Sequence, residues 1–302
     1  MDKSGFIVGI EAGGTSFLLG LAAIKDIHNI VISKRIETVS PEETLGQCKK
    51  IIELWGKSHN ILAIGVAAFG PIDLTEGSEF YGYITTTPKE QWKFTNILGF
   101  FEKSFPSMVC TMHTDVYPPA LAESKETFES PSISTAYVTV GTGIGASVCF
   151  EDESTIFCEA GHASCPVSRV DQLTGFPGVC SFHKCGCIEG MACASSIAKR
   201  AGIDPSELKS LPDDHDVWNN VAHYLAHLCL NITLMWRPKR IVLGGGVMQR
   251  SCLFKLIRMK FVKYLNDYVS VPPVDKYIVP PKLSHPGLIG AFYLASRGLK
   301  KL

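Results

Sequence analysis

The sequence predicts an α/β fold built as two related lobes. Apolar, strand-like runs alternate with helix-like segments along the chain, which is typical of α/β proteins. Each half also contains an apolar run that leads into a glycine-rich turn, first Gly13-Gly14-Thr15 and later Gly141-Thr142-Gly143-Ile144-Gly145. Because no low-complexity segment separates the halves, we expect two packed lobes with a hinge between them.

Composition indicates a folded globular protein and argues against several function classes. The 302 residues are 46% hydrophobic and 10% aromatic, which is enough to build a large core. The 29 basic and 29 acidic side chains balance to a formal charge of zero, which argues against a nucleic-acid partner. The longest apolar run, residues 61–69, is far shorter than the ~20 residues that span a bilayer. We therefore expect a cytoplasmic protein with no membrane partner.

In the first half, three predicted strands are followed by a helix and two further strands. The helix begins at Ser40-Pro41-Glu42-Glu43, which offers a capping hydroxyl, a proline at the first helical position and a glutamate three residues after the cap. The last strand ends on Thr114-Asp115. The predicted strands are residues 6–10, 17–21, 30–36, 61–67 and 108–112.

In the second half, a strand at 135–140 leads into the second glycine turn. A long helix at 217–236 stops before Pro238, and a strand at 240–243 follows it. His223 and His227 lie four residues apart on this helix; with no third ligand nearby in the sequence, we expect them to have packing partners and not a metal.

Three glycine turns follow predicted strands and are candidates for binding phosphate; the third contains Gly244, Gly245 and Gly246. Glycine lets backbone N–H groups approach an anion closely, and threonine adds a hydroxyl donor. One such turn alone could equally be a tight turn without a ligand. The turns lack the lysine of a Walker A loop and the spacing of a dinucleotide fingerprint, so we expect a different fold, with a nucleotide between the lobes.

The eleven cysteines do not fit a secreted disulfide framework, because an odd number is spread over a long chain. Five lie between residues 158 and 187, and Cys165 is the most remote of these as a metal ligand. Five others lie singly in apolar surroundings, where we expect small buried side chains: Cys48, Cys110, Cys149, Cys229 and Cys252.

A cluster of metal-binding residues contains Cys180, His183, Cys185 and Cys187, with His162 eighteen residues before Cys180. Thiolates and imidazoles are the ligands of tetrahedral structural Zn²⁺, and this short spacing lets one loop surround the ion. Since five residues compete for four positions, the spacing alone leaves the ligand set open. The alternative is a coincidental group of reduced thiols.

Asp115 follows a predicted buried strand and can act as a general base. A carboxylate in this place can accept the proton of a hydroxyl group as that hydroxyl attacks a phosphorus atom. The alternative role is that of a helix N-cap, and one residue can serve both roles.

Taken together, the motifs resemble a known family. In chain order they are Glu11-Ala12-Gly13-Gly14-Thr15, Phe69-Gly70-Pro71-Ile72-Asp73, Thr114-Asp115, Gly141-Thr142-Gly143-Ile144-Gly145, Glu159-Ala160-Gly161-His162, the segment 180–189 and the triple glycine. This order is similar to that of the ROK family of sugar kinases, repressors and open reading frames, which has the actin/hexokinase-like fold. Within it, the chain most resembles the fructokinases, which share Thr85-Thr86-Thr87-Pro88-Lys89 and a threonine before the catalytic aspartate.

The resemblance implies a two-lobed ATPase fold with a zinc-binding loop in the second lobe. The first lobe would hold residues 1–117 and a C-terminal helix at 287–302, and the second lobe residues 118–286. The implied reaction is transfer of the γ-phosphate of ATP, bound with Mg²⁺, to the 6-hydroxyl of fructose, with Asp115 as general base. The family's oligomeric state implies a homodimer.

The resemblance also assigns site residues. The implied sugar-binding residues are Thr114, Glu159, His162 and Glu189. The implied nucleotide-binding residues are Gly13, Gly14, Thr15, Gly141, Thr142, Gly143, Gly244, Gly245 and Gly246. The implied structural Zn²⁺ ligands are His162, Cys180, His183 and Cys187, with Cys185 as the alternative to His183.

Two positions depart from the family pattern. Ser16 stands where lysine is usual in the first phosphate turn, which removes a positive charge, and Tyr117-Pro118-Pro119 replaces the usual asparagine and alanine after Asp115. We expect the following helix to start later than usual because of the prolines. The alternatives to a fructokinase are a kinase for glucose, mannose or N-acetylmannosamine and a catalytically weak sugar-sensing homologue. A DNA-binding repressor is disfavoured by the zero charge and by a first strand that already starts at Phe6.

Overall fold

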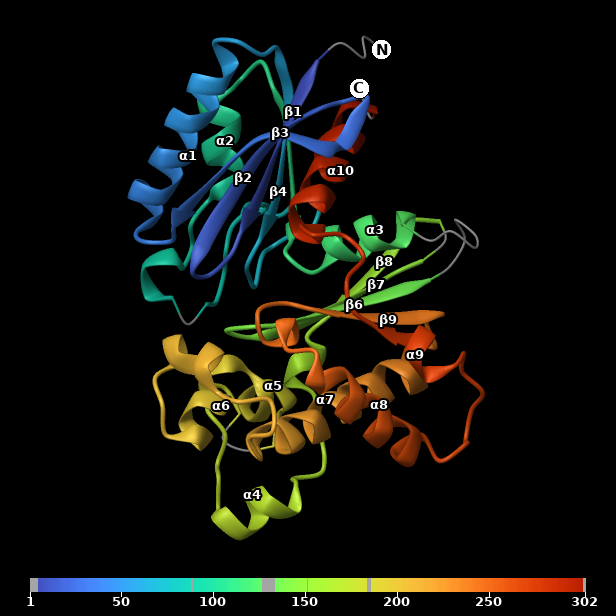
Figure 1. The fold of residues 1–302 in the computed structure, drawn as a ribbon. Helices are drawn as coiled ribbons and strands as arrows, with labels where there is room; N and C mark the ends of the chain where they lie inside the picture. Colours follow the sequence, from blue (N-terminus) through green and yellow to red (C-terminus); the bar gives the residue numbers. More distant parts are fainter. Residues whose placement is uncertain (1–4, 88, 127–133, 151, 184–185, 301–302) are drawn as a thin grey trace. The chain divides into compact units, whose positions relative to one another are not determined.

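The structure is a computed structural model that describes residues 5–87, 89–126, 134–150, 152–183 and 186–300. The chain divides into two compact units (Figure 1). Unit 1 contains Met1–Ala122 and Leu283–Leu302, and unit 2 contains Glu123–Lys282. Each unit has a five-stranded sheet of its own. We propose that the units correspond to the two lobes implied by the sequence.

The sheet of unit 1 has the strand order β3-β2-β1-β4-β5. The first three strands form an antiparallel meander, and β4 and β5 extend the sheet in parallel with β1. The strands are β1 (Phe6–Ala12), β2 (Ser16–Ala23), β3 (Asp26–Glu37), β4 (Ile61–Ala68) and β5 (Val109–Thr114).

Helices cover both faces of this sheet (Figure 1). One face packs against α1 (Pro41–Gly56) and α2 (Ile97–Ser104), and the other against α10 (Pro286–Lys300). Ser40 caps α1 as its sequence predicts, because its Oγ accepts the Glu43 N–H at 3.3 Å. A short 3₁₀ turn, η1 (Glu90–Trp92), places Trp92 in the core, where it is 1% exposed and donates its indole N–H to the carbonyl of Val39.

The sheet of unit 2 repeats this plan with the order β10-β9-β6-β7-β8. Strands β6, β7 and β8 form an antiparallel meander, while β9 and β10 continue in parallel from β6. The bounds are β6 (Thr135–Val140), β7 (Ile144–Cys149), β8 (Thr155–Cys158), β9 (Arg240–Gly244) and β10 (Ile278–Val279). The two sheets therefore have the same topology, although no repeat is visible in the residues.

The core of unit 2 lies between its sheet and a layer of helices dominated by α7 (Val217–Trp236) and α8 (Cys252–Leu265). The remaining helices and turns are α4 (Arg169–Thr174), α5 (Ile188–Ala192), α6 (Ala194–Ala201), α9 (Val274–Tyr277), η2 (Ala160–His162), η3 (Pro205–Ser210) and η4 (Val247–Gln249). Helix α3 (Tyr117–Lys125) runs from the end of unit 1 into unit 2. Among the described helices, none combines the length and apolar character that a membrane span needs.

Most predicted elements are confirmed, and one helix start differs. The segment after Cys187 forms two helices, α5 and α6, because Cys193 is extended (φ −73°, ψ 168°) and interrupts them. Helix α3 starts at Tyr117 and not later, so Pro118 and Pro119 lie within its first turn, where a missing N–H donor costs little. Cys48, Cys149 and Cys229 are buried as expected, while Cys110 and Cys252 are half-buried.

Candidate active site

The carboxyl ends of the parallel strands of unit 1 meet in one row. Ala12 pairs with Ala68, and Ala68 pairs with Thr114, so β1, β4 and β5 end side by side. The Asp115 N–H continues this pattern by donating to the carbonyl of Ala68 at 2.8 Å. The first glycine turn and Asp115 therefore leave the sheet at the same edge, which is where open α/β sheets bind ligands.

The turn that carries Asp115 is held by a histidine that the sequence analysis did not single out. His113 Nδ1 accepts the backbone N–H of Thr114 at 2.9 Å, and its ring lies 4.2 Å from that of Tyr117, centroid to centroid. Arg297 of α10 donates to the Tyr117 hydroxyl. Burial lowers the pKa of His113 to about 4, and the Arg297 charge acts in the same direction. The imidazole is therefore neutral near pH 7, as an acceptor must be.

The two glycine turns of unit 2 also leave one edge of its sheet. Thr139 of β6 pairs with Gly244 of β9, so the chain enters both turns from neighbouring parallel strands. Gly245 has φ +91°, and a Cβ there would lie 2.4 Å from the carbonyl oxygen of Val140, so only glycine fits. Gly141 accepts the N–H of Ala194 at 2.8 Å, which ties this turn to the start of α6.

Glu189 connects the glycine turn of unit 2 with His162. Its Oε2 accepts the Ile144 N–H at 2.8 Å and would lie 2.7 Å from a Cβ placed on Gly143. Its Oε1 lies 3.6 Å from His162 Nε2. Glu159, also predicted at this site, is exposed, and its backbone carbonyl accepts the His162 N–H at 2.9 Å.

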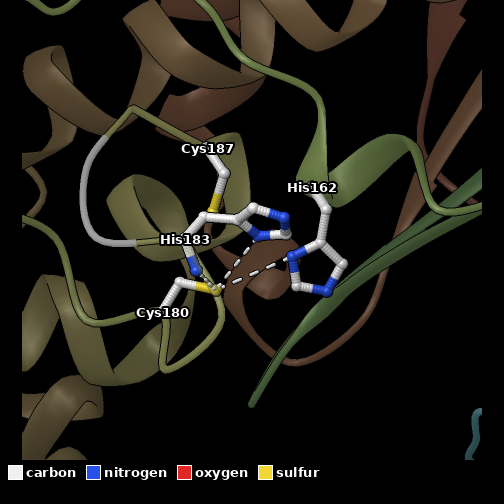
Figure 2. Close-up of side chains that lie close together, drawn as sticks. All are labelled: His162, Cys180, His183 and Cys187. Atoms are coloured by element: carbon white, nitrogen blue, oxygen red, sulfur yellow. Dashed lines mark hydrogen bonds between the residues drawn. The ribbon is translucent and has the colours of Figure 1, made fainter.

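The predicted metal ligands His162, Cys180, His183 and Cys187 form one cluster (Figure 2). One ligand atom from each lies within 4.8 Å of the other three. Cys180 Sγ lies 3.7 Å from His162 Nδ1 and 3.6 Å from His183 Nδ1. Tetrahedral Zn²⁺ with the usual bond lengths separates a sulfur ligand from a nitrogen ligand by about 3.6 Å, so the residues present fit that ion.

The cluster is continuous with the helix that carries Glu189. Cys187 is the N-cap of α5, where its Sγ accepts the Gly190 N–H at 3.3 Å. Burial raises the pKa of Cys187 to about 11, and the nearby Cys180 thiol adds to the shift. Cys165, the remote candidate, lies outside the cluster, although its N–H donates to the carbonyl of Gly186 at 3.1 Å.

A buried ion pair anchors the segment that leads to Cys180. Asp171 of α4, 2% exposed, accepts two hydrogen bonds from Arg200, at 2.9 and 3.0 Å, and one from Asn220 at 3.0 Å. The Arg200 guanidinium lies 4.0 Å from the ring of Phe176, which precedes Cys180. Burial raises the pKa of Asp171, but the hydrogen bonds from Arg200, Tyr224 and Asn220 outweigh it and leave the pKa below its usual value.

His223 and His227 have packing partners, as expected. The ring of His223 bonds Tyr264 Oη at 2.7 Å and donates to the carbonyl of Pro166 at 2.8 Å. The ring of His227 stacks on Tyr264 with centroids 4.4 Å apart. Both nitrogens of His223 are occupied by these bonds, so it is not arranged as a metal ligand.

Comparison with known proteins identifies the family. A model of the ROK family matches residues 7–298, nearly the whole chain. The chain belongs to the ROK family. A fructokinase from Pediococcus pentosaceus is 37% identical to it over 96% of this chain and 98% of that protein.

Two solved structures show the ROK fold of this chain. A ROK hexokinase from Thermus thermophilus is similar with a TM-score of 0.76, at 22% identity over 98% of this chain and 100% of that one. A ROK family glucokinase from Streptomyces griseus, in complex with glucose and AMPPNP, has a TM-score of 0.76, at 17% identity over 97% of this chain and 100% of that one.

The motifs that indicated the ROK family thus fall at strand ends and at the metal-ligand cluster. Pro88 and Cys185 lie outside the described residues, so the choice between His183 and Cys185 remains a prediction. His113, Arg297, Asp171 and Arg200 had no sequence signal, because each acts through a partner that only folding brings close.

Proposed function

We propose that this ROK protein is a kinase that transfers the γ-phosphate of ATP to the 6-hydroxyl of fructose. The main support for this proposal is the position of Asp115, which is half-buried at the end of β5. The first glycine turn leaves the sheet at the same edge. The 37% identity with a fructokinase over nearly the full length of both chains supports the choice of fructose.

Asp115 acts as the general base in this proposal. Its carboxylate accepts the proton of the sugar hydroxyl as that oxygen attacks the γ-phosphorus. A positioned base of this kind contributes roughly 10²- to 10⁴-fold to a rate. Its backbone is held by the bond to Ala68, and Thr114 before it is held by His113. The remaining acceleration comes from placing the reactants in line and from neutralising phosphate charge, which bound Mg²⁺ supplies together with protein donors.

The glycine turns of the two units are the proposed nucleotide-binding residues. In unit 1 the residues are Gly13, Gly14 and Thr15. In unit 2 they are Gly141, Thr142, Gly143, Gly244, Gly245 and Gly246. Their support is the placement of each set at the carboxyl edge of its sheet, where glycine lets the backbone approach an anion closely. The N–H groups of Gly13 and Gly141 are bonded within the turns, to the carbonyls of Ser16 and Gly143, so other N–H groups of the turns would face the anion.

The sugar is bound by Thr114, Glu159, His162 and Glu189 in this proposal. A carboxylate can accept two hydroxyl hydrogens of a polyol, and a site built for such bonds discriminates strongly against analogues that lack them. Glu189 Oε1 lies 3.6 Å from Nε2 of His162, which is itself a member of the Cys/His cluster. In this proposal, the positions of the cluster residues set how the His162 and Glu189 side chains are oriented towards the sugar.

We propose that Zn²⁺ binds to His162, Cys180, His183 and Cys187 and serves a structural role. Four protein ligands leave no coordination position for a substrate. A bound ion would cross-link η2, which carries His162, to Cys187 at the start of α5, and these residues would thereby hold His162 in place relative to Glu189. Because Cys185 competes with His183 for one position, zinc content should be measured in His183→Ala and Cys185→Ala separately, and only the true ligand's variant should lose the metal.

The cytoplasm suits thiolate ligands, which must stay reduced, and is the proposed compartment. The homodimer implied by the family is the proposed assembly, to be measured by sedimentation.

The proposal is tested by ADP release from purified protein with ATP and Mg²⁺ over fructose, glucose, mannose and N-acetylmannosamine. Turnover on fructose should fall about 10²-fold or more in Asp115→Asn. Asp26→Asn, which makes the same charge change at an exposed position of β3, is the matched control and should be fully active. Preference for another sugar would reassign the substrate. No turnover on any sugar by folded, zinc-loaded protein would refute the kinase and leave a sugar sensor.

A further inference from the structure

Ser16 ends the first glycine turn at the position where the family pattern has lysine, so a positive charge beside the nucleotide phosphates is missing from that position. A phosphoryl-transfer site without such a charge leaves the terminal phosphates poorly neutralised. Two cationic side chains of unit 1, Arg35 and Lys89, lie against this turn, and they come from separate segments of the chain.

Arg35 reaches the turn from the neighbouring strand β3. Its Nη1 donates to the hydroxyl of Ser16 at 2.7 Å, so the residue that replaces lysine positions a guanidinium. Sheet register explains the geometry: Leu18 of β2 pairs with Glu11 on one side and with Arg35 on the other, which places all three side chains on one face. Arg35 therefore lies on the same face of the sheet as Glu11, before the turn, and Leu18, after it.

Lys89 reaches the same turn from the segment before η1. A Cβ placed on Gly14 would lie 3.4 Å from Lys89 Cε, which puts the last carbon of the side chain directly beside the turn. The segment is anchored on both sides of the lysine, because Thr87 is 2% exposed and Trp92 is 1% exposed. The Trp92 N–H donates to the carbonyl of Lys89 at 2.8 Å, so the backbone at the lysine is fixed.

The turn itself is arranged to receive an anion. Two of its carbonyl groups, which would repel phosphate, accept hydrogen bonds from Thr38, the residue after β3: Thr38 Oγ1 donates to the Gly13 carbonyl at 2.8 Å, and the Thr38 N–H donates to the Thr15 carbonyl at 3.0 Å. Among the described residues, no carboxylate forms an ion pair with Arg35 or Lys89. Two charges without ion-pair partners thus converge on one glycine turn.

Glu11 is the carboxyl group whose pKa the charge of Arg35 influences. Burial raises the pKa of its carboxyl group, and the positive charge of Arg35 opposes that shift without cancelling it. The charge of Arg35 therefore acts on the Glu11 carboxyl group, while its hydrogen bond is made to Ser16. Because a guanidinium has five N–H donors, this one bond leaves others available for a ligand.

We propose that Arg35 and Lys89 bind the terminal phosphates of the nucleoside triphosphate at the Gly13-Gly14-Thr15 turn, in place of the lysine absent at position 16. The proposal rests on the proposed function insofar as the protein must bind a nucleoside triphosphate. It makes Ser16 a positioning residue that holds Arg35, and not simply a lost cation.

The experiment measures the Kd of wild-type and variant protein for a non-hydrolysable ATP analogue with Mg²⁺, and for adenosine, by calorimetry. Arg35→Ala and Lys89→Ala should each weaken binding of the triphosphate about tenfold, the effect of losing a charge-assisted hydrogen bond. Adenosine, which has no phosphate, should bind equally to all. Ser16→Lys in the Arg35→Ala background should recover affinity, because it restores a cation at the turn.

Matched controls remove the same charge nearby. Lys34→Ala alters the residue beside Arg35 on β3, whose side chain points to the opposite face, and should leave Kd unchanged. Lys93→Ala plays this part for Lys89, since Lys93 pairs with Glu90. Added KCl should weaken triphosphate binding less in the variants than in the wild type, because less charge remains to be screened.

Triphosphate affinity within twofold of wild type in the Arg35→Ala, Lys89→Ala double variant would overturn the proposal, as would a loss that affects adenosine equally. A wild-type protein that binds no nucleoside triphosphate would overturn it together with the proposed function. If instead the triphosphate affinities change as predicted while no sugar is phosphorylated, the inference holds and the kinase assignment fails.

Discussion

The buried pair Asp171–Arg200 lies beside the segment that leads to the Cys/His cluster of unit 2, and Asp171→Asn tests whether the pair holds that segment. Asparagine keeps the size of the side chain and much of its hydrogen bonding to Asn220 and Tyr224. It removes the negative charge that faces Arg200. The guanidinium, whose side chain is only 8% exposed, is then left without its counter-ion.

The expected loss follows from this burial. Removing one partner of a buried ion pair costs about 3–5 kcal/mol, because the remaining charge stays desolvated. For a domain of this size that corresponds to a fall in Tm of about 6–20 °C. The loop that carries Cys180 and His183 should loosen as well, since Arg200 stacks on Phe176 and the Phe176 N–H donates to the carbonyl of Asp171 at 3.1 Å.

Two measurements test this. Denaturant unfolding at pH 7 gives the free energy of unfolding, and the rate at which zinc-loaded protein releases zinc to a colorimetric chelator reports on the loop. Asp213→Asn is the matched control: Asp213 also pairs with an arginine, Arg250, but its side chain is 63% exposed, so the loss should be about 0–1 kcal/mol. Adding Arg200→Met to Asp171→Asn should recover stability, because it removes the uncompensated charge.

Acid should reproduce the effect in the wild type. The folded pKa of Asp171 lies below its ordinary value, so its contribution is complete above the unfolded pKa of about 3.9 and is lost as the pH falls through the folded value. A loss below 1 kcal/mol in Asp171→Asn, or a double variant no more stable than the single one, would refute the idea that the charge pair holds this segment.

Three further predictions concern the site. His113→Gln keeps an acceptor for the Thr114 N–H but does not titrate. Because the pKa of His113 is about 4 in the folded state and about 6.5 in the unfolded state, the wild type should lose stability relative to this variant as the pH falls from 6.5 towards 4. An equal difference in the free energy of unfolding between the two proteins at both pH values would contradict the assignment. Cys180→Ser should lose zinc, measured by mass spectrometry, and raise the fructose KM about tenfold; unchanged KM in zinc-free protein would separate the metal from the sugar. Glu189→Gln should lower kcat/KM for fructose about tenfold, with Glu207→Gln, at an exposed position in η3, as its control.

The elements with strong local signals could be predicted from the sequence. Ser40 caps α1 through its own hydroxyl, and the long apolar period of 217–236 forms α7 without a shift in either boundary. The break at Cys193 could not be predicted, because no proline or glycine marks this position and only the structure shows that its backbone is extended. The contact of Tyr117, the first residue of α3, with Arg297, 180 residues away, could not be predicted either.

The candidate site divides in the same way. Asp115, the glycine turns and the four residues of the Cys/His cluster could be named from the sequence, because their residue types carry the chemistry themselves and they occur in a recognisable order. The identity of the fourth metal ligand stays a prediction, since two residues of one loop compete for it.

The sequence by itself determined the family, the alternation of strands and helices, and which side chains are chemically able to act. Only the tertiary structure decided which distant side chains contact one another around the glycine turn and the Cys/His cluster. Arg35 meets Ser16 because two antiparallel strands pair in one register, and Arg200 meets Asp171 because two helices pack. Such contacts leave no local pattern in the chain, because their energy arises from burial and hydrogen bonding between segments that only folding brings within a few ångströms of each other.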